Sequence, residues 1–223
     1  MTDQPLFPGR RVRPARERLL EAVLLVSGER GYEHISVQDV IERAGTSRAT
    51  FYKHFGDKED CFAQAYREAA NWLYRRLTGL AKRQSTWREG LRVALAELLE
   101  VCARQTALAR ALIVEPHAAG GTALAEHDLV MERLSGAIDS ARREISSRQA
   151  PPPVTATFMV GAIETLVRAK LMSDEPETAP EMLPGLLHFV VMQFYGEDAA
   201  WEELTAAPLA TWASRREAAT RIP

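Results

Sequence analysis

The sequence predicts an all-α protein with a small N-terminal domain of three helices and a larger C-terminal helical domain. Alanine, leucine, arginine and glutamate, which favour helices, are common along its 223 residues. Valine, isoleucine and threonine form no alternating runs of the kind that strands require. Apolar residues instead recur at helical spacing, in segments that glycine and proline separate, so the chain divides into successive helices.

The first predicted helix spans Pro14 to Arg30. Leu19, Val23 and Val26 lie at i, i+4 and i+7, so they form an apolar stripe on one face of this helix. Gly31 follows directly and can end the helix in a left-handed conformation.

Two shorter helices follow, joined by a tight turn. Ser36 and Asp39 have the spacing of a capping box, which predicts that a helix begins at Ser36 and ends before Gly45. Ser47 is placed to cap the next helix, which is expected to run to about His54. Two short helices joined by a glycine-containing turn form a helix-turn-helix motif.

The outward face of the third predicted helix has side chains suited to reading DNA. Phe51 and Phe55 lie one turn apart and are expected to face the core. The other positions offer a guanidinium for guanine, a hydroxyl, and small groups for the thymine methyl. The expected DNA-binding residues of this helix are Arg48, Ala49, Thr50, Tyr52, Lys53 and His54. Packing by Tyr52, capping by His54 and a solvated charge at Lys53 are the alternatives.

The run from Ile35 to Asp60 resembles the DNA-binding domain of the TetR family. Its most specific part is Thr-Phe-Tyr-Lys-His-Phe at residues 50–55, followed by Asp-Lys-Glu at residues 57–59. The resemblance extends over residues 14–62, whereas the C-terminal domain resembles the family in length and helical layout only.

The resemblance implies a homodimer whose three N-terminal helices bind double-stranded operator DNA. It also implies a C-terminal domain that binds an unknown small-molecule effector and thereby releases the DNA. By position, Ser36 and Gln38 would lie at the edge of the groove, and Lys58 would hold a phosphate. Thr46 and Ser47, in the turn, complete the expected DNA-binding set.

Four regions are predicted along the chain. They are a disordered basic arm (1–13), a helix-turn-helix DNA-binding domain (14–57), a helical regulatory and dimerisation domain (58–196) and a C-terminal extension (197–223). The arm is basic because arginines crowd the start of the chain, although the net charge of the whole protein is -2. Further helices are expected at 58–82, 87–104, 106–114, 122–148, 154–172 and 181–195, with one or two short helices after Gly196.

A ligand pocket is implied by the resemblance, among the helices between Trp87 and about Met172. Its expected lining consists of large apolar side chains, each of which is more often an ordinary core residue than a pocket residue. These residues are Trp87, Leu91, Leu95, Cys102, Met131, Phe158 and Met159.

Dimerisation is expected through the last two helices of the C-terminal domain. They carry more apolar residues than one buried stripe requires, and a two-fold four-helix interface would bury the excess. The expected interface residues are Leu166, Leu171, Leu183, Leu187, Val190 and Phe194. Such a dimer would hold its two recognition helices roughly 34–36 Å apart, or somewhat more, one turn of DNA.

Several classes of site are not predicted. The sequence shows no nucleophile–base pair and no glycine-rich phosphate loop, so we expect neither an enzyme nor a cofactor. Glu115, His117, His127 and Asp128 are potential metal ligands, but their spacing matches no standard site, so no metal is expected. Glu164 and Arg168 are expected to form an i, i+4 ion pair.

The cysteines and the hydropathy of the chain indicate where the protein is expected to act. Cys61 and Cys102 form no CxxC pair and are expected to be ordinary thiols. No segment is apolar enough for a membrane span or a leader, so a cytoplasmic protein without membrane partners is expected. A helical enzyme with a vestigial motif lacks supporting features. A C-terminal domain that binds a protein partner stays open because of Trp201 and Trp212 in the extension.

Overall fold

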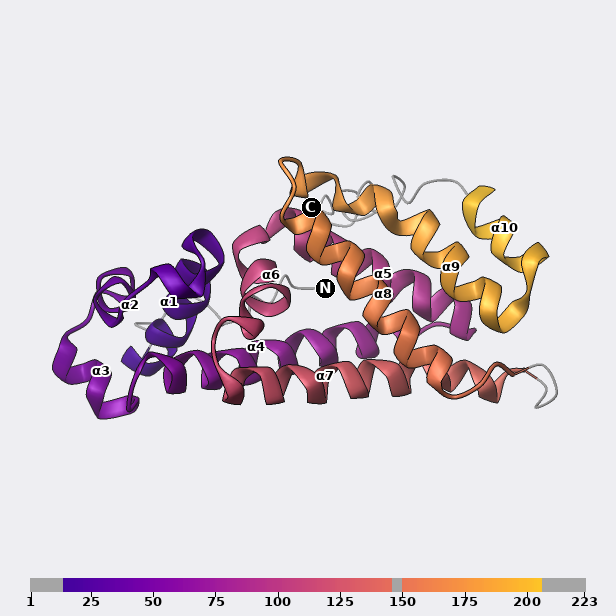
Figure 1. The fold of residues 1–223 in the computed structure, drawn as a ribbon. Coiled ribbons are helices and arrows are strands. Elements are labelled where there is room, and N and C mark those ends of the chain that lie inside the picture. Colours follow the sequence, from indigo (N-terminus) through magenta and orange to yellow (C-terminus); the bar gives the residue numbers. More distant parts are fainter. Residues whose placement is uncertain (1–13, 146–149, 206–223) are drawn as a thin grey trace, which may run out of the picture.

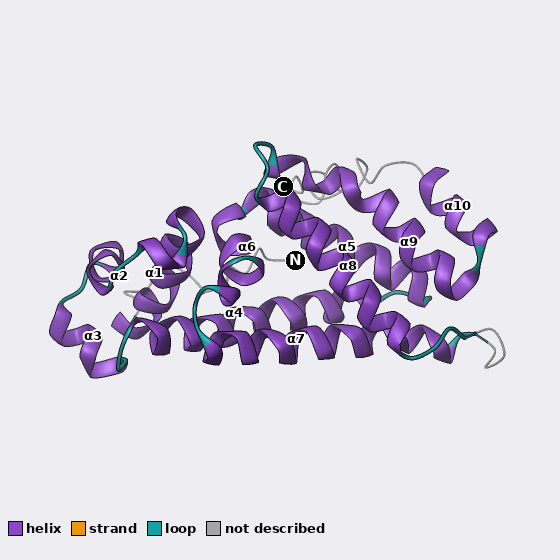
Figure 2. Ribbon diagram, viewed as in Figure 1, coloured by secondary structure: helices purple, strands orange, loops and turns teal. Residues whose placement is uncertain are grey.

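The computed structural model describes residues 14–145 and 150–205 (Figure 1). The predicted basic arm, the end of the helix expected at 122–148, and Trp212 lie outside the described residues. The all-α prediction is confirmed, because the described residues form helices and loops and contain no strand (Figure 2). None of the described helices combines the length and the hydropathy that a membrane-spanning segment requires.

The helices agree closely with those expected from the sequence. They are α1 (Ala15–Arg30), α2 (Val37–Ala44), α3 (Arg48–His54), α4 (Lys58–Ala81), α5 (Trp87–Arg104), α6 (Thr106–Ile113), α7 (Gly121–Asp139), α8 (Val154–Leu171), α9 (Leu183–Tyr195) and α10 (Glu197–Thr205). Short 3-10 helices connect them: η1 (Tyr32–His34), η2 (Glu115–His117), η3 (Ser140–Arg143) and η4 (Pro176–Met182).

Two helix ends differ from the expectation. The helix predicted to continue to residue 148 ends at Asp139 and passes into η3, where the Ser140 hydroxyl donates to Ala137 O at 2.7 Å. Such local side-chain bonds compete with the helical backbone pattern. The helix predicted to begin near residue 181 begins at Leu183, directly before Pro184, because proline is favoured in the first helical turn.

The helices form an elongated molecule. We call residues 15–57, with α1 to α3, the head, and the described helices α4 to α10 the body. The head lies at one end in Figure 1, while α4 and α7 run side by side along the length of the molecule. Helices α5, α8, α9 and α10 form the opposite end, with α10 packed on α9.

Two hydrophobic cores lie along the molecule. The first core combines the head with the first half of α4, as far as Ala70, and with Leu108 and Leu112 of α6. The second core is formed mainly by α5, α8 and α9. Helix α6 contributes to both, because Ala109 belongs to the second core and Ile113 packs against each of them. The head is therefore joined to the body through shared packing rather than through a free linker.

Helix α10 is fixed to α5 by a buried ion pair. The Glu203 carboxylate is 2% exposed and accepts hydrogen bonds from Arg88 and Arg92 of α5, with Arg88 Nη2 at 2.7 Å. Arg88 also donates to Ala199 O at 3.2 Å. The first part of the predicted C-terminal extension is thus a helix packed on the body.

Candidate DNA-binding surface and its connection to the body

The capping signals of the helix-turn-helix are confirmed. Asp39 N donates to Ser36 Oγ, and Ser36 N donates to the Asp39 carboxylate at 2.8 Å, so the capping box closes in both directions. Hydrogen bonds from the Ser36 hydroxyl and the Ser36 backbone N–H to the Asp39 carboxylate, with Arg30 nearby, lower the pKa of Asp39 below its usual value of 3.8. Ser47 Oγ likewise accepts from Thr50 N at 3.1 Å and begins α3.

The turn between α2 and α3 is fixed from α1. Gly45 ends α2 with φ 60° and ψ 49°, the left-handed conformation that glycine adopts most easily. Arg18 Nη1 donates to Ala44 O at 2.9 Å and to Gly45 O at 3.1 Å, so it satisfies carbonyl groups at the end of α2. No sequence signal predicted this role for Arg18, because the contact joins residues on different helices.

Helix α3 buries Phe51 and exposes the face expected to bind DNA. Phe51 and Phe55 are buried in the first core, as predicted. Arg48, Ala49 and Lys53 are exposed, and within the described residues neither charge of this helix has an ion-pair partner. Tyr52 is 52% exposed while its ring meets the Phe51 ring edge-on, with centroids 5.3 Å apart.

The remaining expected contact residues divide by what their side chains already bind. The hydroxyls of Ser36 and Ser47 cap helices, and the Thr50 hydroxyl lies 2.9 Å from Ser47 Oγ. Gln38 Nε2 donates to Glu42 at 2.9 Å and leaves its amide oxygen available. Thr46 and His54 are half-buried at the margins of the same surface. The exposed members of the whole set are Ser36, Gln38, Ser47, Arg48, Ala49, Tyr52 and Lys53.

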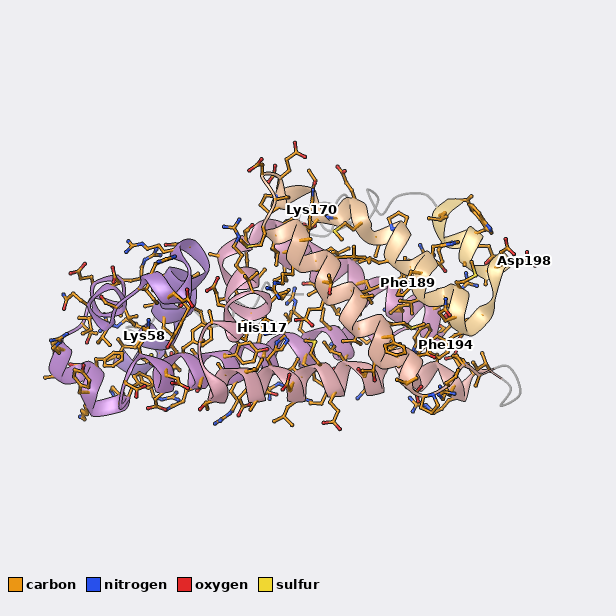
Figure 3. All side chains as sticks on the ribbon, in the orientation of Figure 1. Lys58, His117, Lys170, Phe189, Phe194 and Asp198 are labelled. Atoms are coloured by element: carbon orange, nitrogen blue, oxygen red, sulfur yellow. The ribbon has the colours of Figure 1, made fainter. Side chains whose placement is uncertain are left out.

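Lys58 has partners inside the head. Its Nζ donates to Tyr32 O at 2.9 Å and Ile35 O at 2.8 Å, and it lies 4.0 Å from the centre of the Tyr32 ring. Figure 3 shows Lys58 within the head. Desolvation lowers the pKa of this ammonium. Since an ammonium has three donors, one remains for the expected phosphate contact. Lys58 therefore stabilises the head whether or not it binds DNA.

Two contacts connect the head to the body at α6 and η2. Tyr32 N donates to Glu115 Oε2 at 2.6 Å in a buried setting. Gly28 of α1 packs so closely against α6 that a Cβ at this position would lie 1.7 Å from the Ala107 carbonyl oxygen. Movement of α6 must therefore move α1 or break this contact.

The residues expected to line a pocket are mostly packed within the second core. Leu91, Leu95, Cys102 and Met159 are buried there, and Trp87 and Met131 pack against it. Phe158 is 69% exposed, so in one protomer it faces outward. The pocket therefore stays a prediction. The thiols of Cys61 and Cys102 are both free and buried, and burial raises the pKa of Cys102 to about 12.

The residues expected at the dimer interface are likewise mostly internal. Of that set, Leu171, Leu183, Leu187, Val190 and Phe194 are buried within one protomer. Leu166 alone is exposed, at 50%. Other apolar side chains of α8 and α9 are exposed instead, namely Val154, Phe158 and Phe189. We call these exposed side chains, together with Leu166, the α8–α9 face.

Glu164 does not form the ion pair expected from its spacing to Arg168. Its Oε1 lies 2.9 Å from His127 Nε2 and 3.9 Å from His117 Nε2, whereas no ion pair with Arg168 occurs in the described structure. The neighbouring imidazole of His127 is the main cause of a lowered pKa for Glu164. Glu164 faces α7 because the buried His127 lies there, a tertiary contact that helical spacing cannot predict.

The head has the architecture of a helix-turn-helix DNA-binding domain, and comparison with known proteins agrees. Residues 19–65 match the model of the bacterial regulatory proteins of the tetR family. The transcriptional repressor AcnR of Corynebacterium glutamicum is 39% identical over 56 residues, which cover 25% of this chain and 30% of that protein. The match thus spans less than a third of this relative. The N-terminal domain of this chain is therefore similar to the DNA-binding domain of the tetR family.

Solved structures extend the similarity to the body. The fatty acid degradation regulator FadR from Bacillus halodurans has a TM-score of 0.66 at 16% identity, covering 80% of this chain and 97% of that one. FadR from Bacillus subtilis in complex with stearoyl-CoA has a TM-score of 0.61 at 17% identity, covering 81% and 98%. At these identities the likeness concerns the fold of head and body together.

Proposed function

We propose that this protein is a homodimeric transcriptional repressor that binds operator DNA through α3 and is released by a small ligand bound in the body. The exposed face of α3, with Arg48, Tyr52 and Lys53 free of ion pairs in the described structure, carries the DNA-binding part of the proposal. Arginine suits guanine, and lysine suits phosphate. Such a protein would act in the cytoplasm, where the chromosome lies.

The arrangement of α6 supports coupling between the ligand and DNA. Leu108 and Leu112 pack in the first core, Ala109 in the second, and Ala107 touches Gly28. A ligand that favours one position of α6 would therefore bias the orientation of α1 and the head. The repressor named among the relatives, and the stearoyl-CoA complex of a protein of the same fold, agree with this proposal.

Fluorescence anisotropy with labelled DNA from the protein's own promoter tests DNA binding. We expect Arg48→Ala to weaken specific binding by about 1–3 kcal/mol, because one bidentate base contact is lost. Arg104→Ala is the matched control, since this arginine of α5 is exposed and pairs only with Glu100 in the described structure. Equal binding by wild type and Arg48→Ala, at low salt, would contradict the proposal.

The two lysines separate phosphate binding from head stability. Removal of the exposed Lys53 should reduce the slope of log affinity against log salt by about one unit, with the unfolding midpoint unchanged. Removal of Lys58 should reduce the slope and also destabilise the head, because its bonds to Tyr32 and Ile35 are lost. An unchanged salt slope in both variants would exclude phosphate contacts at these positions.

A body that binds a protein instead of a small molecule is the second candidate. Trp201 of α10 is 53% exposed beside the exposed Leu204, which is the composition of a small interaction surface. Trp201→Ala should abolish regulation in cells if a protein partner binds here. Regulation that survives this change, together with a small molecule that releases DNA from the purified protein, favours the first candidate.

A further inference from the structure

Two histidines and a glutamate converge at the junction between α7, α8 and η2. His117 lies at the end of η2, His127 on α7 and Glu164 on α8, and one ligand atom from each lies within 4.8 Å of the others. His127 is 2% exposed, Glu164 is half-buried, and the His117 side chain is 41% exposed. Figure 3 shows His117 near the middle of the molecule, where η2 meets the long helices.

We propose that His117, His127 and Glu164 form a binding site for a divalent transition metal, of which Zn²⁺ is the best match. Two imidazoles and one carboxylate are ligands that Zn²⁺ accepts readily, whereas Mg²⁺ and Ca²⁺ prefer oxygen ligands throughout. This site lies outside the DNA-binding surface, so the proposal does not depend on the proposed repressor function.

The Glu164 carboxylate oxygen lies near both imidazoles but accepts no hydrogen bond in the described structure. Glu164 Oε1 is buried and, within the described structure, receives no hydrogen bond of ordinary geometry, although His127 Nε2 lies 2.9 Å away. In a tetrahedral zinc site with bonds of about 2.0–2.1 Å, neighbouring ligand atoms are about 3.4 Å apart. The distances of 2.9 and 3.9 Å from Glu164 Oε1 to the two imidazoles bracket that value.

Tyr66 of α4 is placed as an outer partner of the site. Its hydroxyl lies 3.0 Å from His127 Nδ1 and is buried, and the two rings meet edge-on. A histidine that binds a metal through Nε2 usually donates its Nδ1 proton to such a partner, which fixes the ring and its tautomer. Tyr66 therefore leaves Nε2 free to face Glu164 when Nδ1 carries the proton.

The site has three protein ligands and room for a fourth. The exposure of His117 leaves one side open to solvent, so water or a carboxylate of a small molecule can complete the coordination. Zinc sites with three protein ligands generally keep such an open position. The expected occupant is thus an exchangeable metal rather than a closed structural ion.

Titration of the full-length, untagged protein with Co²⁺ and then Zn²⁺ tests the proposal. We expect one equivalent of Co²⁺ to give the visible absorption bands of tetrahedral coordination, and Zn²⁺ to displace it. His117→Ala and Glu164→Gln should each weaken Zn²⁺ binding at least about tenfold. Because His117 is exposed and glutamine matches glutamate in size, both variants should retain the wild-type circular dichroism spectrum.

Two further variants distinguish Zn²⁺ binding at this site from Zn²⁺ binding to other histidines of the chain. Tyr66→Phe should weaken Zn²⁺ binding about 10–100-fold while it preserves the packing of the ring. His34→Ala, which removes an exposed histidine of the head, should change nothing. Failure of the wild type to bind one equivalent overturns the proposal. It is equally overturned if binding survives both ligand variants, or if His34→Ala weakens binding as much as His117→Ala does.

Discussion

The head and the body differ in how completely one protomer covers their apolar side chains. Among the described head residues, the one exposed large aromatic or apolar side chain is Tyr52, which belongs to the expected DNA-binding surface. The body exposes many more, namely Leu129, Val154, Phe158, Leu166, Met172, Phe189, Trp201 and Leu204. Since large exposed apolar patches commonly mark interaction sites, these side chains make the body the better candidate for a partner surface.

The α8–α9 face is the part of the body where exposed apolar residues favour pairing with a second copy of the chain. Its exposed apolar residues are accompanied by Gly161 and Gly185, which have open space around the Cα and would allow close approach of another helix. A second copy of the chain, related by a two-fold axis, can cover this surface with the same surface of its own. The comparison therefore supports the proposed DNA contact by the head and the proposed self-association through the body.

The largest expected effect is loss of the dimer in Phe158→Glu. A charge on the α8–α9 face would have to be buried without a partner, so the protein should become monomeric. Operator affinity should then fall roughly 10²–10⁴-fold, because two linked half-site contacts become independent. Analytical ultracentrifugation and anisotropy measure the two effects. Leu129→Glu, on α7, is the control, and a Phe158→Glu dimer of wild-type affinity would refute the interface.

The next largest effect is expected in Glu203→Gln. This change leaves Arg88 and Arg92 without their buried carboxylate, and we expect a loss of about 3 kcal/mol in the free energy of unfolding. Glu202→Gln is the matched control, because Glu202 is exposed and its pair with Arg88 should contribute less than about 1 kcal/mol. Urea unfolding followed by circular dichroism compares the variants. Equal losses would show that α10 is not held by the buried pair.

A smaller effect is expected at the junction of head and body. Gly28→Ala should cost about 1–3 kcal/mol, since the new methyl group meets the Ala107 carbonyl and forces α1 and α6 apart. Gly79→Ala, at an open position of α4, should instead stabilise the protein by about 0.5–1 kcal/mol. The same unfolding experiment measures both. A stable Gly28→Ala protein would mean that α6 moves freely relative to the head.

The smallest effect is expected at the cap of α2. Ser36→Ala should cost about 1 kcal/mol, while Ser36→Thr keeps the hydroxyl and should cost less. The pKa of Asp39 is lower in the folded protein than in the unfolded chain. Its carboxylate therefore stabilises the fold at pH values above the unfolded pKa, and this stabilisation disappears as the pH falls through the folded pKa. Asp39→Asn should therefore make thermal unfolding less dependent on pH below about 4. If the thermal unfolding of Asp39→Asn depends on pH as that of the wild type does, the stability of the cap comes from Ser36 alone.

The head was predictable from sequence because its signals are local. Ser36, Ser47 and Gly45 act on residues within one turn of themselves, and the structure confirms these caps and helix bounds. The TetR-like run around Phe51 and Tyr52 then located the expected DNA-binding face.

The sequence predicted where the helices of the body lie along the chain, but not what each side of a helix packs against. A helical pattern shows that Leu171 and Val190 are apolar, yet it cannot say whether they meet their own chain or a second copy. The approach of Glu164 to His127 was missed for the same reason, because helices distant in sequence supply the two residues. Arg18 and Gly28 were missed as connecting residues, since their partners are backbone groups of other helices.

The position of α6 between two cores limits how separable the head is from the body. A fragment ending after α4 would uncover the surfaces that now meet Leu108, Ala111 and Leu112, so it should aggregate or unfold. Exchange of this body for that of a relative would also require a residue as small as Gly28 opposite the incoming α6. A chimaera that combines the head or the body of this chain with another protein should therefore fold only when α1 and α6 are both taken from this chain.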